Sequence, residues 1–106
     1  MGTNRRYAGA VDAKANERIL QTVARDQQLQ SLTPVELRLD EVPLTVDPRP
    51  RRQVKAWVRF GETPVRVDAV AARWTPDAVG IVFRVDDVEH RCWVWVGAVD
   101  EAKRMP

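Results

Sequence analysis

The side chains of this sequence that could do chemistry gather near its C-terminal end. His90 and Cys92 follow three acids, Asp86, Asp87 and Glu89. A catalytic histidine needs a nucleophile or a carboxylate placed beside it by the fold, and the local spacing suggests neither. Alternation along a strand puts Cys92 on a predicted core face, where a thiol behaves as a small hydrophobic group. We therefore expect a protein that is not an enzyme and predict no catalytic residue.

Metal and cofactor chemistry is not predicted either. The histidine and the cysteine do not recur at the spacing of a zinc site, and the short acidic hairpin lacks the ligand count of a calcium loop. The chain has only five glycines and no glycine-rich phosphate loop. We predict no metal, no cofactor and no small-molecule substrate.

Tryptophans and arginines on one face of a predicted sheet give the stronger functional signal. The segments 54–60, 64–74, 78–85 and 90–96 alternate with a period of two, which is typical of strands. One face of these strands is almost entirely aliphatic. The other face is predicted to hold all four tryptophans with arginines between them. The predicted partner-binding residues are Trp57, Arg59, Trp74, Arg84, Arg91, Trp93 and Trp95.

Two interpretations of this predicted tryptophan–arginine face stay open. An N-terminal helix could cover it, so that the indoles form a second small core with arginines stacked on them. Alternatively, part of the face stays exposed for a partner, because Trp and Arg are enriched in binding hot spots. The helix stripe of Ile19, Leu20 and Val23 is too narrow to cover four indoles. The leading hypothesis is therefore a non-catalytic module that binds a protein partner or forms a homodimer.

A basic strip supports an alternative hypothesis, nucleic-acid binding. Arginine suits phosphate because its planar guanidinium donates hydrogen bonds in pairs. The net charge of +2 is low for a dedicated nucleic-acid binder, which places this hypothesis second. The residues of the strip are Arg49, Arg51, Arg52, Lys55 and Arg59.

Length and composition predict one domain over residues 1–106. The 44% hydrophobic and 30% charged content is typical of a soluble globular protein. The expected parts are a flexible basic tail (1–10), a helical segment (11–42), a Pro/Arg linker (43–53) and an antiparallel β unit (54–102).

Helix signals occur only in the first half of the chain. Residues 11–30 contain neither Pro nor Gly and carry apolar residues at helical spacing. Thr33, Pro34 and Glu36 match a capping box with proline at the first helical position, which favours a short second helix over a strand. The predicted fold class is α+β: one or two N-terminal helices, then four or five antiparallel strands in an SH3-like barrel or a curled sheet.

Membrane insertion and secretion are not expected. No apolar run approaches the roughly 20 residues of a membrane-spanning helix. The basic pair Arg5-Arg6 has no apolar stretch behind it, so a signal peptide is not predicted. Cys92 alone cannot form an internal disulfide, which agrees with a reducing compartment. We expect a cytoplasmic protein.

Five segments also carry a resemblance. They read MGTNRRYA, SLTPVEL, VKAWVRF, RWTPDAV and CWVWVGAV, and they spread over most of the chain. Together they resemble a group of small uncharacterised proteins of high-G+C actinobacteria and their phages or mobile elements. The ending DAVGIVF followed by WVWVGAV is also similar to a short barrel ending common among phage and plasmid accessory proteins. The resemblance implies an accessory role and brings no known activity.

Overall fold

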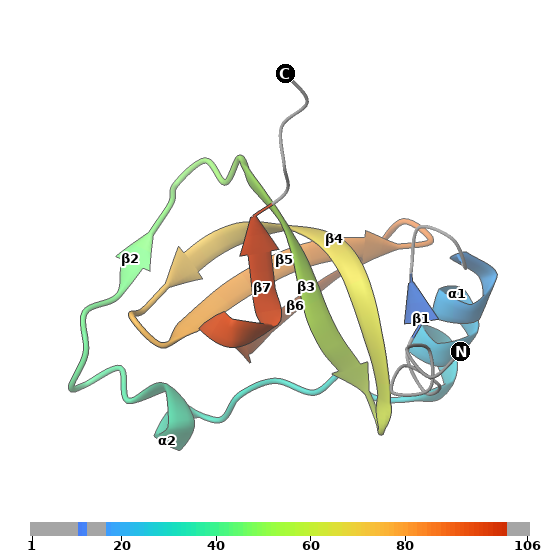
Figure 1. Ribbon diagram of the computed structural model, residues 1–106, viewed down its shortest axis with the longest axis horizontal. Coiled ribbons are helices and arrows are strands. Elements are labelled where there is room, and N and C mark those ends of the chain that lie inside the picture. The colour runs from blue at the N-terminus through green and yellow to red at the C-terminus, as the bar shows by residue number, and fades with distance from the viewer. Residues whose placement is uncertain (1–10, 13–16, 102–106) are drawn as a thin grey trace, which may run out of the picture.

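A computed structural model describes residues 11–12 and 17–101 of the chain (Figure 1). Within these residues a sheet of seven strands is accompanied by two α-helices, one of them short. The elements are β1 (Val11–Asp12), α1 (Glu17–Asp26), α2 (Pro34–Leu37), β2 (Thr45–Val46), β3 (Arg52–Phe60), β4 (Thr63–Trp74), β5 (Ala78–Val85), β6 (Val88–Trp95), a 3-10 helix η2 (Val96–Ala98) and β7 (Val99–Glu101).

The sheet is built around β4, which pairs with four other strands. The main strand order is β6-β5-β4-β3-β7, and β1 and β2 add to β4 outside this path. Only β1 runs parallel to its neighbour; the other pairs are antiparallel. Figure 1 shows the sheet curling so that β3 and β6 approach each other, although it does not close. The predicted small antiparallel sheet is thus confirmed in outline.

Tight turns connect the strands where the sequence places turn residues. Gly61, between β3 and β4, has a φ of 61°, which is a left-handed conformation that glycine adopts without strain. Asp86 and Asp87, between β5 and β6, both have positive φ (52° and 67°). Two successive positive values are the mark of a type I′ turn, whose twist matches that of the flanking strands.

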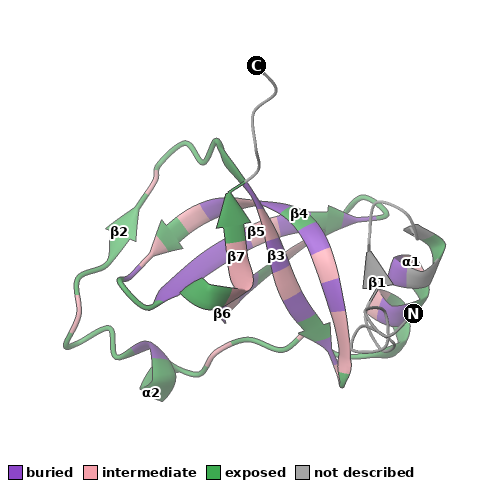
Figure 2. Ribbon diagram, in the orientation of Figure 1, coloured by how far each residue is buried: buried purple, intermediate pink, exposed green. Residues whose placement is uncertain are grey.

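The core lies on one face of the curled sheet. Burial alternates with a period of two along β3 and β4, as the striped ribbons of Figure 2 show. Phe60, Val65 and Ile81 are the largest fully buried side chains. Val96 was predicted on this core face but is 51% exposed, because β6 ends at Trp95 and η2 breaks the alternation.

The first helix is shorter than the predicted range 11–30. Within the described residues α1 covers only Glu17–Asp26, while Val11–Asp12 pairs with β4 as strand β1. Residues 28–30 lack an apolar stripe, and their backbone instead bonds to β3 and to the turn that follows it. Leu20 and Val23 of α1 pack into the main core. Among the residues described, no helix is long and apolar enough to cross a membrane.

The predicted capping box is confirmed at the start of α2. The Thr33 amide donates to Glu36 Oε1 (2.9 Å), and the Glu36 amide donates to Thr33 Oγ1 (3.2 Å). Arg38 follows in the left-handed region (φ 50°) and ends the helix after one turn. The segment predicted as a linker also contains β2, which pairs with Arg73 and Trp74 of β4. The predicted basic tail, residues 1–10, lies outside the described residues.

Candidate functional site

Three of the four tryptophans line a groove between β3 and β6. Its volume is about 480 Å³, and its walls come from the facing edges of these two strands. Trp57 and Trp93 are half-buried, and Trp95 is 46% exposed. The lining residues are Gln30, Leu32, Trp57, Val58, Arg59, Pro64, Trp93, Val94, Trp95 and Ala98. We call this the indole groove.

The backbone segment 28–32 holds the two walls of the indole groove at a fixed spacing. The Gln30 amide donates to the Arg59 carbonyl oxygen (2.8 Å), which ties the segment to β3. The Leu32 amide donates to the Trp93 carbonyl oxygen (3.0 Å), and the Trp93 amide donates to Ser31 Oγ (2.9 Å). The segment therefore bridges two strand edges that the sheet itself leaves apart. This bridge was not predicted, because residues 28–32 were interpreted as the end of a helix and the connection after it.

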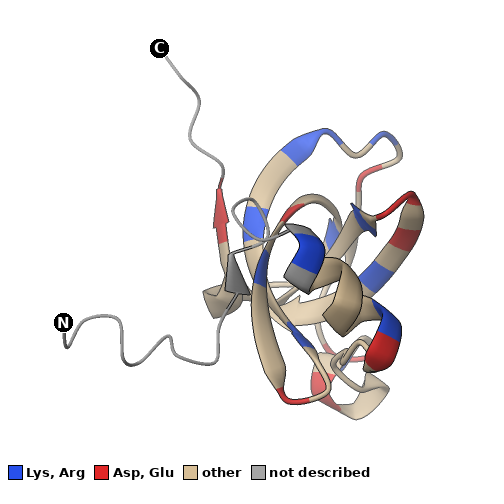
Figure 3. Cartoon of the chain, turned by 90° about the vertical axis from the view of Figure 1, so that its right-hand side faces the viewer, with Lys and Arg blue, Asp and Glu red and all other residues tan. Residues whose placement is uncertain are grey.

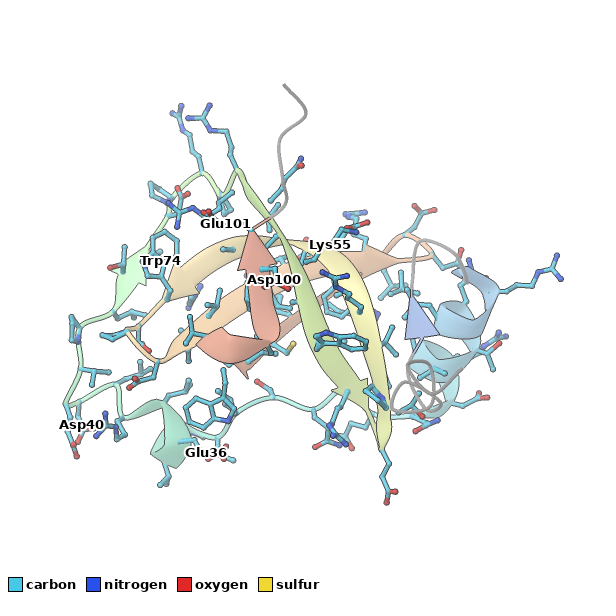
Figure 4. The ribbon with its side chains drawn as sticks, in the orientation of Figure 1. Glu36, Asp40, Lys55, Trp74, Asp100 and Glu101 are labelled. Carbon is cyan, nitrogen blue, oxygen red and sulfur yellow. The ribbon has the colours of Figure 1, made fainter. Side chains whose placement is uncertain are left out.

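Trp74 was predicted on the same face as the other tryptophans, and this prediction is wrong. The register between β4 and β5 shifts between Ala71 and Arg73, which marks a β-bulge. One extra residue reverses the alternation, so Trp74 pairs with Val79 and packs against the core. Trp74 and Glu101, at the same end of the sheet in Figure 4, line a separate cavity of about 200 Å³.

Of the two interpretations left open, the covering helix is not found at the indole groove among the described residues. The apolar residues of α1, Leu20 and Val23, belong to the core on the other face of the sheet. No residue of α1 lines the groove among those described. Partial cover comes instead from Leu32 and Ala98, which border the groove from the bridging segment and from η2. With this partial cover Trp95 remains exposed.

Of the predicted arginines, only Arg59 reaches the indole groove. Arg91 lies on β6 and holds Glu89, with its Nη2 atom 2.8 Å from Glu89 Oε2. Arg84 is exposed on β5 and belongs to a wider groove on the outer face of the sheet. The tryptophan–arginine face predicted as one surface is therefore two surfaces in the structure.

The wider outer groove carries charges of both signs. It has a volume of about 1120 Å³, and Lys55 and Arg66 lie in it beside acidic partners. Lys55 Nζ is 3.0 Å from Asp68 Oδ1, and Arg66 Nη2 is 3.4 Å from Asp100 Oδ2. Figure 4 shows Lys55 and Asp100 on the adjacent strands β3 and β7. Strand β7 was not predicted as a separate strand, because three residues are too few to show a period.

The arginines of the basic strip also lie in different surroundings. Arg49 and Arg51 are exposed and make no ion pair within the described part of the chain. Arg52 lies 3.9 Å from Glu101 by its Nε atom, and its guanidinium carbon is 5.2 Å from the centroid of the Trp74 ring. Figure 3 shows basic and acidic segments interspersed on the side of the molecule that carries α1.

The two side chains with potential reactivity are used in packing. His90 stacks on Phe83 with a centroid distance of 5.3 Å and meets the Phe60 ring edge-on. Cys92 is buried, and desolvation raises the pKa of its thiol to about 11. A thiol with this pKa is a poor nucleophile at neutral pH. Three or more His, Cys, Asp or Glu residues grouped for a metal ion are not found among the residues that the structure covers.

No protein-family model, no curated protein and no solved structure matches this chain. The geometry of the indole groove is therefore the basis for a functional proposal.

Proposed function

We propose that this protein is a non-catalytic binding module that takes a protein partner on the indole groove. The observation that carries the proposal is Trp95, which is 46% exposed in a groove that two further indoles also line. Burying a whole indole removes roughly 150–250 Å² from water. Trp95 is already about half buried, so a partner that covers it removes roughly half of that area from water. Tryptophan and arginine are also the residues most often found at binding hot spots.

Further exposed apolar residues directly follow Trp95 in the chain and lie on α2. Val96 follows Trp95 directly and is 51% exposed, and its amide donates to the Asp77 carbonyl oxygen (2.8 Å). Arg38, at the end of α2, reaches the Asp77 carboxylate at 3.3 Å, so α2 lies close to this surface. Val35 of α2 is 85% exposed. An apolar surface of this kind suits an interface with a partner protein. If the partner is a second copy of the chain, the interface forms a homodimer.

The curled sheet and its aromatic-lined groove support an SH3-like description, because SH3 domains bind extended segments in aromatic-lined grooves. The resemblance to actinobacterial and phage proteins supports an accessory role in a phage or mobile element. The single cysteine supports a cytoplasmic location.

Peptide display tests the binding function. Random peptides are selected on the folded protein, and the selected peptides are measured against Trp95→Ala and against Val88→Ala. Both residues are exposed on β6, but only Trp95 lines the groove. We expect Trp95→Ala to abolish binding and Val88→Ala to leave it unchanged. Sedimentation at several concentrations tests self-association in the same variants. If neither peptide binding nor self-association depends on Trp95, the proposal is wrong.

Nucleic-acid binding is the second candidate, and one observation favours it. The bulge that moves Trp74 places its ring beside Arg52, which directly follows the exposed Arg51, so cations and an indole meet at one end of the sheet. Single-stranded nucleic acid is bound by such combinations. Labelled oligodeoxythymidylate should bind with strong salt dependence and lose affinity in the Arg49→Glu, Arg51→Glu double variant. Affinity that does not change with salt would exclude this candidate.

A further inference from the structure

We infer that the indole groove takes an extended segment of a partner protein in which apolar side chains stand next to an acidic one, and that Arg59 binds the acidic side chain. This inference rests on the proposed function and specifies the chemistry of the partner. It follows from the charge at the groove, from the backbone that already occupies one end of it, and from its apolar lining.

The charge at the groove is positive and unmatched. Arg59 is the one charged residue among the described residues that line the groove, and it is exposed. Lys55, Arg66 and Arg91 on the same sheet each have a carboxylate within 3.4 Å. Arg59 has no ion pair in the described part of the chain. A guanidinium in this position pairs best with a carboxylate, which accepts two parallel hydrogen bonds from it.

The backbone at one end of the groove shows that an extended chain fits between these strand edges. Leu29 forms an isolated antiparallel bridge with Phe60, and the Leu32 amide donates to the Trp93 carbonyl oxygen. The amide and carbonyl of Trp93 both face the bridging segment. The backbone amide and carbonyl groups of residues two apart in a strand point toward the same neighbouring edge. The backbone of Trp95 therefore faces the same edge as that of Trp93. An extended partner can therefore continue along β6 where the bridging segment leaves it.

The apolar lining of the groove favours apolar side chains in the partner, next to its acidic side chain. Val58 and Val94 are buried core residues at its base, and the indoles form the walls. Apolar side chains of a partner would meet only apolar surface there, and their burial supplies most of the affinity. The carboxylate at Arg59 then fixes the register of the segment, because electrostatic complementarity gives specificity more than affinity.

Selection of random displayed peptides on the wild type and on two charge-reversed variants tests the inference. The variants are Arg59→Glu and Arg84→Glu, which change the net charge equally; Arg84 is also an exposed sheet arginine but lies outside the indole groove. Peptides selected on the wild type should be enriched in Asp or Glu next to apolar residues. Their affinity should fall about tenfold or more with Arg59→Glu and stay unchanged with Arg84→Glu. Arg59→Glu should itself select peptides with Lys or Arg at the same place.

The possible outcomes distinguish a failure of this inference from a failure of the proposed function. Peptides that need Trp95 but show no acidic enrichment overturn the inference and leave the proposed function in place. Equal losses with Arg59→Glu and Arg84→Glu overturn it as well, because they indicate a general charge effect. Self-association that depends on Trp95, without peptide binding, identifies a second copy as the occupant and overturns the extended partner. Thermal unfolding of each variant confirms that it is folded, and Arg59→Ala repeats the affinity test if Arg59→Glu is not.

Discussion

The Trp93 amide donates a 2.9 Å hydrogen bond to the Ser31 hydroxyl, although 62 positions separate the two residues in the chain. Together with the bond from the Leu32 amide to the Trp93 carbonyl oxygen, it joins the bridging segment to the last long strand. The same segment is bonded to Arg59 on β3. The indole groove is therefore shaped by a contact between the N-terminal part of the chain and β6.

Replacing Ser31 by Ala should destabilise the protein by about 0.5–1.5 kcal/mol, because the Trp93 amide loses its acceptor. Ser31→Thr keeps the hydroxyl and should stay within about 0.5 kcal/mol of the wild type. Urea unfolding followed by tryptophan fluorescence measures both values. Equal stability of the Ala and Thr variants would show that water replaces the hydroxyl without loss.

Gly61 and Gly97 form a matched pair for a test of backbone conformation. Gly61 has a φ of 61°, and an added Cβ would meet the Gln27 side chain, whereas a Cβ at Gly97 has nothing within 4 Å. Gly61→Ala should destabilise the β3–β4 turn by about 1–2 kcal/mol. Gly97→Ala should change stability by less than about 0.5 kcal/mol. Similar losses in both variants, measured by denaturant unfolding, would contradict the assigned turn conformation.

The strand pattern was predictable because one physical rule acts on every residue of a half-buried strand. Val54, Val67 and Ile81 are buried as the period of two requires. The capping box at Thr33 was predictable for a similar reason, since its partners are three residues apart. Local rules of this kind need no knowledge of the rest of the fold.

The set of residues that line the indole groove was not predictable from these local rules. The bulge after Ala71 has no signature in the sequence, and it alone moves Trp74 to the other face. The bridge from Ser31 to Trp93 depends on long-range backbone bonding. Leu20 of α1 packs into the main core because of the end of the sheet against which the helix lies. Tertiary contacts decided all three.

Because of the bulge, replacing Trp74 and replacing Trp95 should change the stability of the protein by different amounts. Trp74 packs against the core and lies under the Arg52 guanidinium, so Trp74→Ala should destabilise the protein by about 2–4 kcal/mol. Trp95 is 46% exposed, and Trp95→Ala should cost less than about 1 kcal/mol. Thermal or urea unfolding compares the two. Trp74→Phe should recover part of the loss, and a larger loss for Trp95 than for Trp74 would contradict the assigned faces.

Cys92 predicts a pH dependence of stability at alkaline pH. Burial raises the pKa of its thiol from 9.0 to about 11, so between these values the unfolded chain is ionised at Cys92 while the folded chain is not. The stability that this residue contributes is complete below pH 9 and is lost as the pH rises toward 11, by about 2 kcal/mol. Other groups also titrate in this range, and the comparison with Cys92→Ala removes their effect. The stability difference between wild type and variant should shrink across this interval, as measured by urea unfolding.

Iodoacetamide should label the folded wild type slowly at pH 8 and quickly once urea unfolds it, because only the thiolate reacts. A stability difference that stays constant from pH 8 to pH 11 would mean that Cys92 is not desolvated in the folded protein.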